Sequence, residues 1–225
     1  MARKETNLAN SCNLVISEYG GRVRRNNVGY DREKKMSYGL GVGSSDFIGW
    51  MPVSDRAVIL AVEYKTPGVR TTVPVERLDL VTDELWEQIL STNLVGMFRC
   101  CKAAAPALKA SKGSIVNLAS IGAFKGSGSA SSMAYAAAKA GVVNMTRNLA
   151  RALGPEVRVN AIAPGSVDSP WLEWTDQQRK GSLEKSLLKK IGKPSEYADV
   201  IVFLGFGTEL MTGETVIVDA GLTLG

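Results

Sequence analysis

The amino-acid sequence predicts one doubly wound α/β domain with a mostly parallel sheet. Two short apolar segments rich in β-branched residues, 113–120 and 157–162, are typical of buried parallel strands. Between them, residues 133–153 are rich in Ala and Leu and end at Gly154-Pro155, which predicts a single helix. A strand, a helix and a second strand in this order form the right-handed crossover unit of such sheets.

The other elements extend this pattern in both directions. Residues 58–62 form an apolar run that fits a further strand, and residues 215–218 form another. A long helix is expected over 83–110, because Asp83 and Glu84 suit the positive N-terminus of a helix. Its apolar residues recur at helical spacing and predict a buried stripe made of Leu85, Ile89, Leu90, Leu94 and Phe98.

Length and composition agree with one domain over residues 1–225, long enough to bury a sizeable core. Hydrophobic residues make up 45% and charged residues 22% of the chain, as in ordinary globular proteins. No apolar run approaches the roughly 18 residues of a membrane-spanning helix, and the N-terminus begins no secretion signal. The cysteines Cys12, Cys100 and Cys101 suggest no disulfide framework, so we expect a cytoplasmic location.

The chain contains no histidine, and this restricts its chemistry. A Ser-His-Asp triad and a histidine-bound zinc site are excluded, and the cysteines lack metal-ligand spacing. The net charge of +5 arises mostly within residues 1–40, where eight Lys and Arg face four acidic residues. No stacking aromatics or known motif accompany these charges, so we expect a solvated surface and no nucleic-acid partner.

Tyr135 and Lys139 are the first candidates for catalysis. On the predicted helix they lie four residues apart, so the phenol and the ammonium share one face. A nearby cation favours the ionised phenol, which a tyrosine needs in order to act as a general acid or base. Such a pair also occurs by chance on many helices. Here Ser120 ends the preceding strand, at the edge where open α/β sheets place their ligands.

Five segments, in order, resemble the classical short-chain dehydrogenases/reductases, in particular the 3-oxoacyl-acyl-carrier-protein reductases. The matching residues are Asn93 in Ser-Thr-Asn-Leu-Val-Gly, Ser120 in Val-Asn-Leu-Ala-Ser, the pair Tyr135 and Lys139, the run 158–165 and the run 212–221. The resemblance covers about residues 66–225. It implies a single Rossmann-like domain, in which residues 66–225 form the catalytic part and residues 1–65 an atypical nucleotide-binding part.

The resemblance also implies a reaction, the NAD- or NADP-dependent interconversion of a secondary alcohol and a ketone. In such an enzyme Tyr135 exchanges the hydroxyl proton, while Lys139 favours its ionisation and contacts the nicotinamide ribose. Ser120 holds the carbonyl oxygen, and Asn93 positions a water that links Lys139 to solvent. The residues that would border the nicotinamide are Pro164, Gly165, Val167 and Ser169. A 3-oxoacyl thioester or a sugar or other polyol is the expected substrate, and a homodimer or homotetramer the expected assembly.

The first sixty-odd residues depart from the family pattern. The glycine-rich loop of the nucleotide site is missing, and the run 39–43 is the nearest candidate, although it lacks a convincing preceding strand. Three explanations compete: an altered or shifted gene sequence, a divergence that builds the same strands, and loss of the nucleotide site. The last would make the chain a catalytically silent binding or assembly protein. Trp171 and Trp174 either pack on the core or form a lid over the substrate.

Overall fold

A computed structural model gives the fold of the chain. Backbone alone is described for five strands, namely β1 (Arg22–Arg25), β2 (Gly29–Asp31), β3 (Met36–Tyr38), β4 (Phe47–Val53) and β5 (Arg56–Val62). Side chains are described as well at residue 78 and over residues 81–126, 133–168 and 174–225. The candidate glycine run 39–43, Ser169 and Trp171 lie outside the described residues.

The main sheet has six strands in the order β1-β4-β5-β6-β7-β8, completed by β6 (Ser114–Leu118), β7 (Arg158–Pro164) and β8 (Thr215–Val218). β5 pairs in parallel with β6, β6 with β7 and β7 with β8. The predicted parallel pairing of the segments near 114–119 and 157–162 is therefore confirmed, as is the strand at 58–62.

The amino-terminal strands run differently. β4 pairs antiparallel with both β1 and β5, while β2 and β3 form a separate antiparallel pair. Only Ser54 and Asp55 separate β4 from β5 in the sequence. Two residues can connect antiparallel strands, whereas a parallel pair needs a crossover of a dozen or more. The short connection thus dictates the direction of β4.

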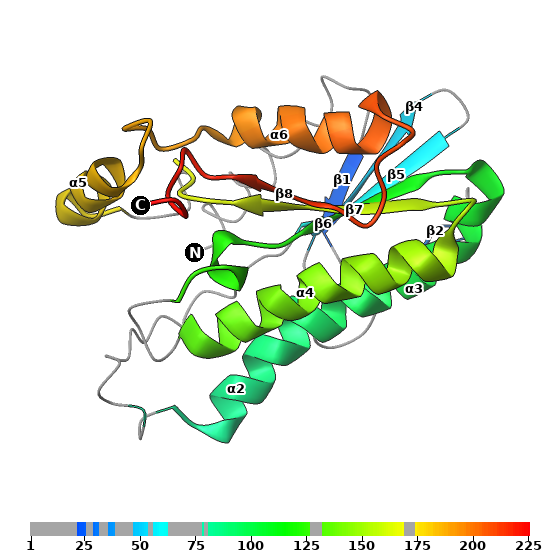
Figure 1. The fold of residues 1–225 in the computed structure, drawn as a ribbon. Coiled ribbons are helices and arrows are strands. Elements are labelled where there is room, and N and C mark those ends of the chain that lie inside the picture. The colour runs from blue at the N-terminus through cyan, green and yellow to red at the C-terminus, as the bar shows by residue number, and fades with distance from the viewer. Residues whose placement is uncertain are drawn as a thin grey trace.

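Helices cover both faces of the sheet, which confirms the doubly wound, Rossmann-like α/β fold. α3 (Gly96–Ser111) and α4 (Ser132–Leu153) lie on one face, and α6 (Pro194–Val202) lies on the other (Figure 1). The helix expected over 83–110 is divided: α2 (Asp83–Leu90) continues through a π-helical turn, Ser91–Val95, into α3. α5 (Asp176–Lys185) lies beyond the end of the sheet (Figure 1). None of the described helices is long and apolar enough to traverse a lipid bilayer.

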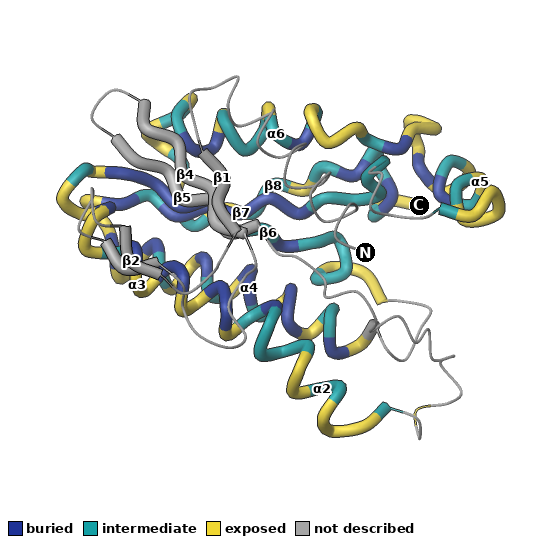
Figure 2. The backbone as a smooth tube through the Cα atoms, turned by 180° about the vertical axis from the view of Figure 1, so that it is seen from behind, coloured by how far each residue is buried: buried dark blue, intermediate teal, exposed yellow. Residues whose placement is uncertain are grey.

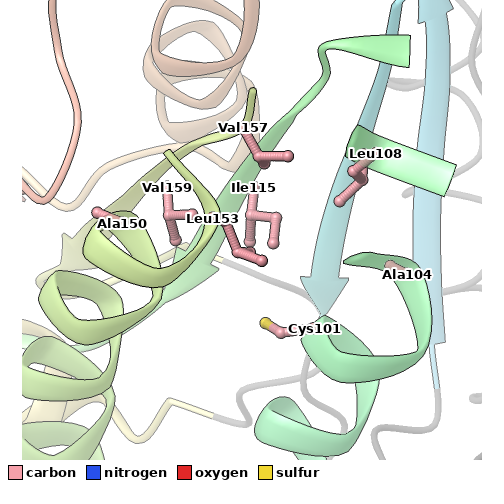
Figure 3. Packing of buried hydrophobic residues seen from close by; sticks show 8 residues of the cluster. All are labelled: Cys101, Ala104, Leu108, Ile115, Ala150, Leu153, Val157 and Val159. Carbon is pink, nitrogen blue, oxygen red and sulfur yellow. The ribbon is translucent and has the colours of Figure 1, made fainter. Parts of the chain in front are cut away.

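The core between the sheet and α3 and α4 consists of interlocking small and branched side chains. The buried face of α4 is turned toward the sheet and its exposed face away from it (Figure 2). One cluster joins α3 and the end of α4 to strands β6 and β7 (Figure 3). Its members are Cys101, Ala104, Leu108, Ile115, Ala150, Leu153, Val157 and Val159. Complete burial of a side chain such as Leu108 or Ile115 contributes about 1.5–3 kcal/mol, so this packing holds both helices firmly on β6.

Candidate active site

Ser120 lies just beyond the carboxyl end of β6. The strand is extended past Leu118 by a bond from the Ala119 N–H to the Ile162 carbonyl of β7, at 2.8 Å. The chain then turns sharply, and the Ser120 hydroxyl accepts a hydrogen bond from the Gly122 N–H at 3.1 Å. This bond caps the short 3-10 turn Ile121–Ala123 and fixes the hydroxyl at the edge of the sheet.

Tyr135 lies next to Ser120, although fourteen residues separate the two in the sequence. A Cβ placed on Gly122 would be 3.5 Å from Ser120 Oγ and 3.7 Å from Tyr135 Cε1, so both side chains flank this glycine. On α4 the Lys139 Nζ lies 5.5 Å from the centroid of the Tyr135 ring. The predicted pairing of phenol and ammonium on one helix face is therefore what the structure shows, with the Ser120 hydroxyl and the Tyr135 ring both next to Gly122.

Lys139 is almost completely buried, with 1% of its surface exposed. Its ammonium donates a hydrogen bond to the Leu118 carbonyl at the end of β6, at 2.9 Å. A charged group taken out of water needs such partners, because burial without them is costly. The bond also ties α4 to the strand that leads into Ser120, so it holds Tyr135 and Ser120 at the same edge.

Asn93 belongs to the π-helical turn between α2 and α3. It is buried, and its side-chain amide donates to the Ile89 carbonyl at 3.0 Å. Its Oδ1 is also buried and has no hydrogen-bond partner among the described residues. The turn packs against α4, where a Cβ on Gly141 would come within 2.8 Å of Leu94. The absence of a side chain at Gly141 thus lets the turn that carries Asn93 approach the helix that carries Lys139.

The segment from Pro164 to Asp168 follows β7 along the same edge. The Gly165 N–H donates to the Val218 carbonyl at 2.9 Å, and a Cβ on Gly165 would lie only 2.7 Å from Asp219. Val167 forms an isolated parallel bridge with Gly192. The bonds of this bridge are made by Ser166 and Asp168, so the Val167 N–H and C=O point to the opposite side. On that side the Trp174 indole donates to the Val167 carbonyl at 3.2 Å.

Several residues that anchor this segment carry no signal in the sequence. Arg179 on α5 holds both carboxylate oxygens of Asp168, at 2.7 and 3.3 Å. Ser182 donates to the Ser166 hydroxyl at 2.7 Å, and Tyr197 on α6 donates to the Ser166 carbonyl at 2.8 Å. These pairs are 11 to 31 residues apart, and such contacts follow no local periodicity.

Asp168 and the anchor Tyr197 both have shifted acid–base properties. The hydrogen bond from Arg179 lowers the pKa of the Asp168 carboxyl, because it stabilises the charged form. Burial raises the pKa of the Tyr197 hydroxyl to about 12, because the apolar surroundings disfavour the phenolate. Asp168 therefore stays an acceptor and Tyr197 a donor at neutral pH.

The geometry thus brings Asn93, Ser120, Tyr135, Lys139, Pro164, Gly165 and Val167 to elements that meet at the carboxyl ends of the parallel strands. A hydroxyl, a phenol and an ammonium side by side can bind an oxygen and exchange a proton with it. The sequence predicted the contact between the Tyr135 phenol and the Lys139 ammonium. It did not predict which residues anchor the 164–168 segment.

Comparison with known proteins gives consistent results. The family model described as enoyl-(acyl carrier protein) reductase matches residues 69–223. The chain is 41% identical over 130 residues to the short-chain dehydrogenase/reductase homolog YusR of Bacillus subtilis, an alignment that covers 57% of this chain and 98% of that relative. It is 36% identical over 146 residues to the 3-oxoacyl-[acyl-carrier-protein] reductase FabG of Thermotoga maritima, covering 63% of this chain but only 58% of that relative.

A solved structure has a similar fold. The crystal structure of a 3-oxoacyl-[acyl-carrier protein] reductase with bound NAD from Brucella melitensis matches with a TM-score of 0.60 and 29% sequence identity. The match covers 68% of this chain and 57% of that one. The family model spans the part of the chain that holds the described site, whereas this chain covers less than two thirds of the Thermotoga relative and of the Brucella structure.

Proposed function

Because this chain belongs to the short-chain dehydrogenase/reductase family, we propose that it is an NAD- or NADP-dependent oxidoreductase that interconverts a secondary alcohol and a ketone. The observation that carries the proposal is the gathering of Ser120, Tyr135 and the buried Lys139 at the carboxyl end of β6. A protein that only bound or assembled would have no chemical need for a phenol, an ammonium and a hydroxyl in this arrangement.

The described residues fit the nicotinamide end of such a cofactor. The Val167 N–H and C=O point away from Gly192. They would serve as a donor and an acceptor for the carboxamide, which would share the carbonyl with the Trp174 indole. Pro164 and Gly165 lead into this segment from β7. With Tyr135, Lys139 and Ser169, these residues would hold the nicotinamide and its ribose. When bound, the cofactor supplies or accepts the hydride.

The chain itself supplies orientation and the proton. In the reducing direction, the Ser120 hydroxyl holds the substrate oxygen while the Tyr135 hydroxyl delivers a proton to it. The Lys139 ammonium beside the ring stabilises the negative charge that develops on the phenol oxygen. Asn93 serves as the site for a water that returns the proton from solvent. In support of this role, its buried Oδ1 has no partner among the residues that the structure describes.

The substrate class and the assembly follow from the same resemblance. A 3-oxoacyl thioester is one proposed substrate, because the Thermotoga relative is a 3-oxoacyl-[acyl-carrier-protein] reductase; a sugar or other polyol is the other.

Ala137 and Ala140 lie exposed on α4, and small side chains permit the close approach of a second copy in a homodimer or homotetramer. A cytoplasmic location agrees with Cys101, a buried thiol that forms no disulfide.

Replacement of the proton donor tests the proposal. We expect Tyr135→Phe to abolish turnover of ketones with NADH and NADPH, because the ring remains but the exchangeable proton is lost. The melting temperature should stay near that of the wild type. Nicotinamide fluorescence should still increase saturably on cofactor binding, with an affinity lowered by the loss of the contact that the Tyr135 hydroxyl makes. Substantial residual turnover in this variant would reject the assignment of Tyr135. A folded wild-type chain that binds neither cofactor would favour a silent binding or assembly protein instead.

A further inference from the structure

A continuous chain of hydrogen bonds runs through the core beneath the candidate active site. The Cys101 thiol donates to Asn117 Oδ1 at 3.4 Å, and Asn117 Nδ2 donates to the Thr146 hydroxyl at 2.9 Å. The Thr146 hydroxyl in turn donates to the Val142 carbonyl at 2.9 Å. Each donor has an acceptor, so all of these hydrogen bonds are donated in the same direction, from α3 toward α4. We call these three residues, Cys101, Asn117 and Thr146, the polar chain.

The polar chain is buried in the core. Asn117 and Thr146 have no exposed surface, and Cys101 has 1%. Burial raises the pKa of the Cys101 thiol to about 12, so it keeps its proton and remains a donor. Cys101 belongs to the apolar cluster of Figure 3, where its neighbours are alanine, valine, leucine and isoleucine side chains. Polar groups in such a place are costly unless they are fully paired.

The three members stand on the three elements that carry the proposed catalytic residues. Cys101 lies on α3, which continues the turn of Asn93. Asn117 lies on β6, three residues before Ser120. Thr146 lies on α4, seven residues after Lys139 and on the same face of the helix.

We propose that Cys101, Asn117 and Thr146 are positioning residues that fix α3, β6 and α4 in the register required for proton transfer. This inference rests on the proposed function. Apolar packing holds α4 on β6, but it is non-directional and so restrains small shifts along the helix axis less sharply than a directed bond does. The bond between Asn117 and Thr146 is directional and tolerates no such shift. Together with the bond from Lys139 to the Leu118 carbonyl, it attaches α4 to β6 at two points, two helical turns apart.

Two substitutions of one residue separate positioning from packing. Thr146→Val keeps the shape of the side chain and removes the hydroxyl, whereas Thr146→Ser removes a methyl group and keeps the hydroxyl. We expect kcat of Thr146→Val to fall about ten- to a hundredfold, as for a misplaced reacting group, with the KM for cofactor little changed. Thr146→Ser should retain most of the activity. As a control, Asn148→Ala removes an exposed bond within α4 and should leave kcat unchanged.

The double variant Asn117→Val/Thr146→Val tests the same idea if the single variant is too unstable. Removing both partners leaves no unpaired amide, so we expect its melting temperature to recover relative to Thr146→Val while kcat stays low. Equal loss of kcat in Thr146→Ser and Thr146→Val, or wild-type kcat in the double variant, would overturn the proposal.

Hydrogen exchange keeps the inference testable even if the wild type catalyses no alcohol–ketone reaction. In that case the proposed function fails, but the amides of α4 should still exchange faster in Thr146→Val than in Thr146→Ser. Identical exchange in the two variants would refute a positioning role for the polar chain, independently of any activity.

Discussion

Gly165 directly follows β7, and the effect on stability of a single methyl group added there can be worked out from its neighbours. The Cβ of Gly165→Ala would lie 2.7 Å from both Cα and Cβ of Asp219 and 3.2 Å from its carbonyl oxygen. Favourable carbon–carbon contacts need about 3.5–4.0 Å. Asp219 cannot easily give way, because its carboxylate accepts bonds from the Gly221 and Thr223 N–H groups at 2.8 and 2.7 Å. The 164–168 segment must therefore move instead.

The magnitude follows from the nature of the clash. Forcing a methyl group into a filled site costs about 1–3 kcal/mol, and main-chain atoms among the neighbours favour the upper end. In a chain of this size, each kcal/mol lowers the melting temperature by about 2–4 °C. We therefore expect Gly165→Ala to melt about 2–12 °C below the wild type. The displaced backbone also borders the proposed nicotinamide position, so the KM for cofactor should rise in the same variant.

Thermal unfolding and steady-state kinetics measure both effects, and Gly181→Ala provides a matched control. A Cβ on Gly181, within α5, meets nothing within 4 Å. Because glycine inside a helix is less stable than alanine by about 0.5–1 kcal/mol, Gly181→Ala should raise the melting temperature slightly and leave the KM unchanged. A Gly165→Ala protein with wild-type stability and wild-type KM would show that Asp219 does not confine this backbone.

Two further predictions concern pH. The depressed pKa of Asp168 means that its contribution to the free energy of unfolding is present above its ordinary pKa of 3.8 and lost as the pH falls through the lower folded value. Denaturant titrations below pH 4 should therefore show a weaker pH dependence for Asp168→Asn, and an unchanged slope would contradict the contact with Arg179. Tyr197 has the opposite effect on the pH dependence of stability, because its pKa is raised to about 12. Its contribution to the free energy of unfolding is present below pH 10 and declines toward pH 12. Tyr197→Phe should lose about 0.5–1.5 kcal/mol at neutral pH and should lack that alkaline decline; a variant that declines as steeply as the wild type would refute it.

The parallel half of the fold was predictable from the sequence because its signals are local. The β-branched runs that became β6 and β7 are bounded by clear breaks, and the alanine-rich segment that became α4 ends at Gly154-Pro155. The spacing of Tyr135 and Lys139 implies their contact as soon as the helix is known. Their positions beside Ser120 follow from the general rule that ligands bind at the carboxyl ends of parallel strands.

The remaining features depend on contacts between distant segments. Apolar periodicity predicted one helix over 83–110 with Phe98 in its buried stripe. The π-helical turn at Ser91–Val95 adds a residue, which rotates the following helix face by about 100°. Phe98 is therefore 45% exposed, and Met97 is buried in its place. The bond from Tyr197 to Ser166 and the bond from Asn117 to Thr146 span 31 and 29 residues. Such pairs are decided by the packing of whole elements, so no short window of sequence contains them.

The antiparallel direction of β4 determines which groups the amino-terminal part can offer to the pyrophosphate of a cofactor. Phe47 pairs with Val62, so the amino end of β4 lies at the edge where β5, β6 and β7 have their carboxyl ends. In a fully parallel sheet this edge would carry a further junction from strand to helix, where a helix N-terminus receives the pyrophosphate. Among the described residues, β4 offers no such junction. The proposed proton-transfer residues all follow β5 in the sequence, and their geometry depends on β6, α3 and α4. The proton-transfer geometry is therefore set by β6, α3 and α4, whereas dinucleotide affinity depends on the amino-terminal part as well as on Tyr135 and Lys139, so turnover and affinity need separate measurements.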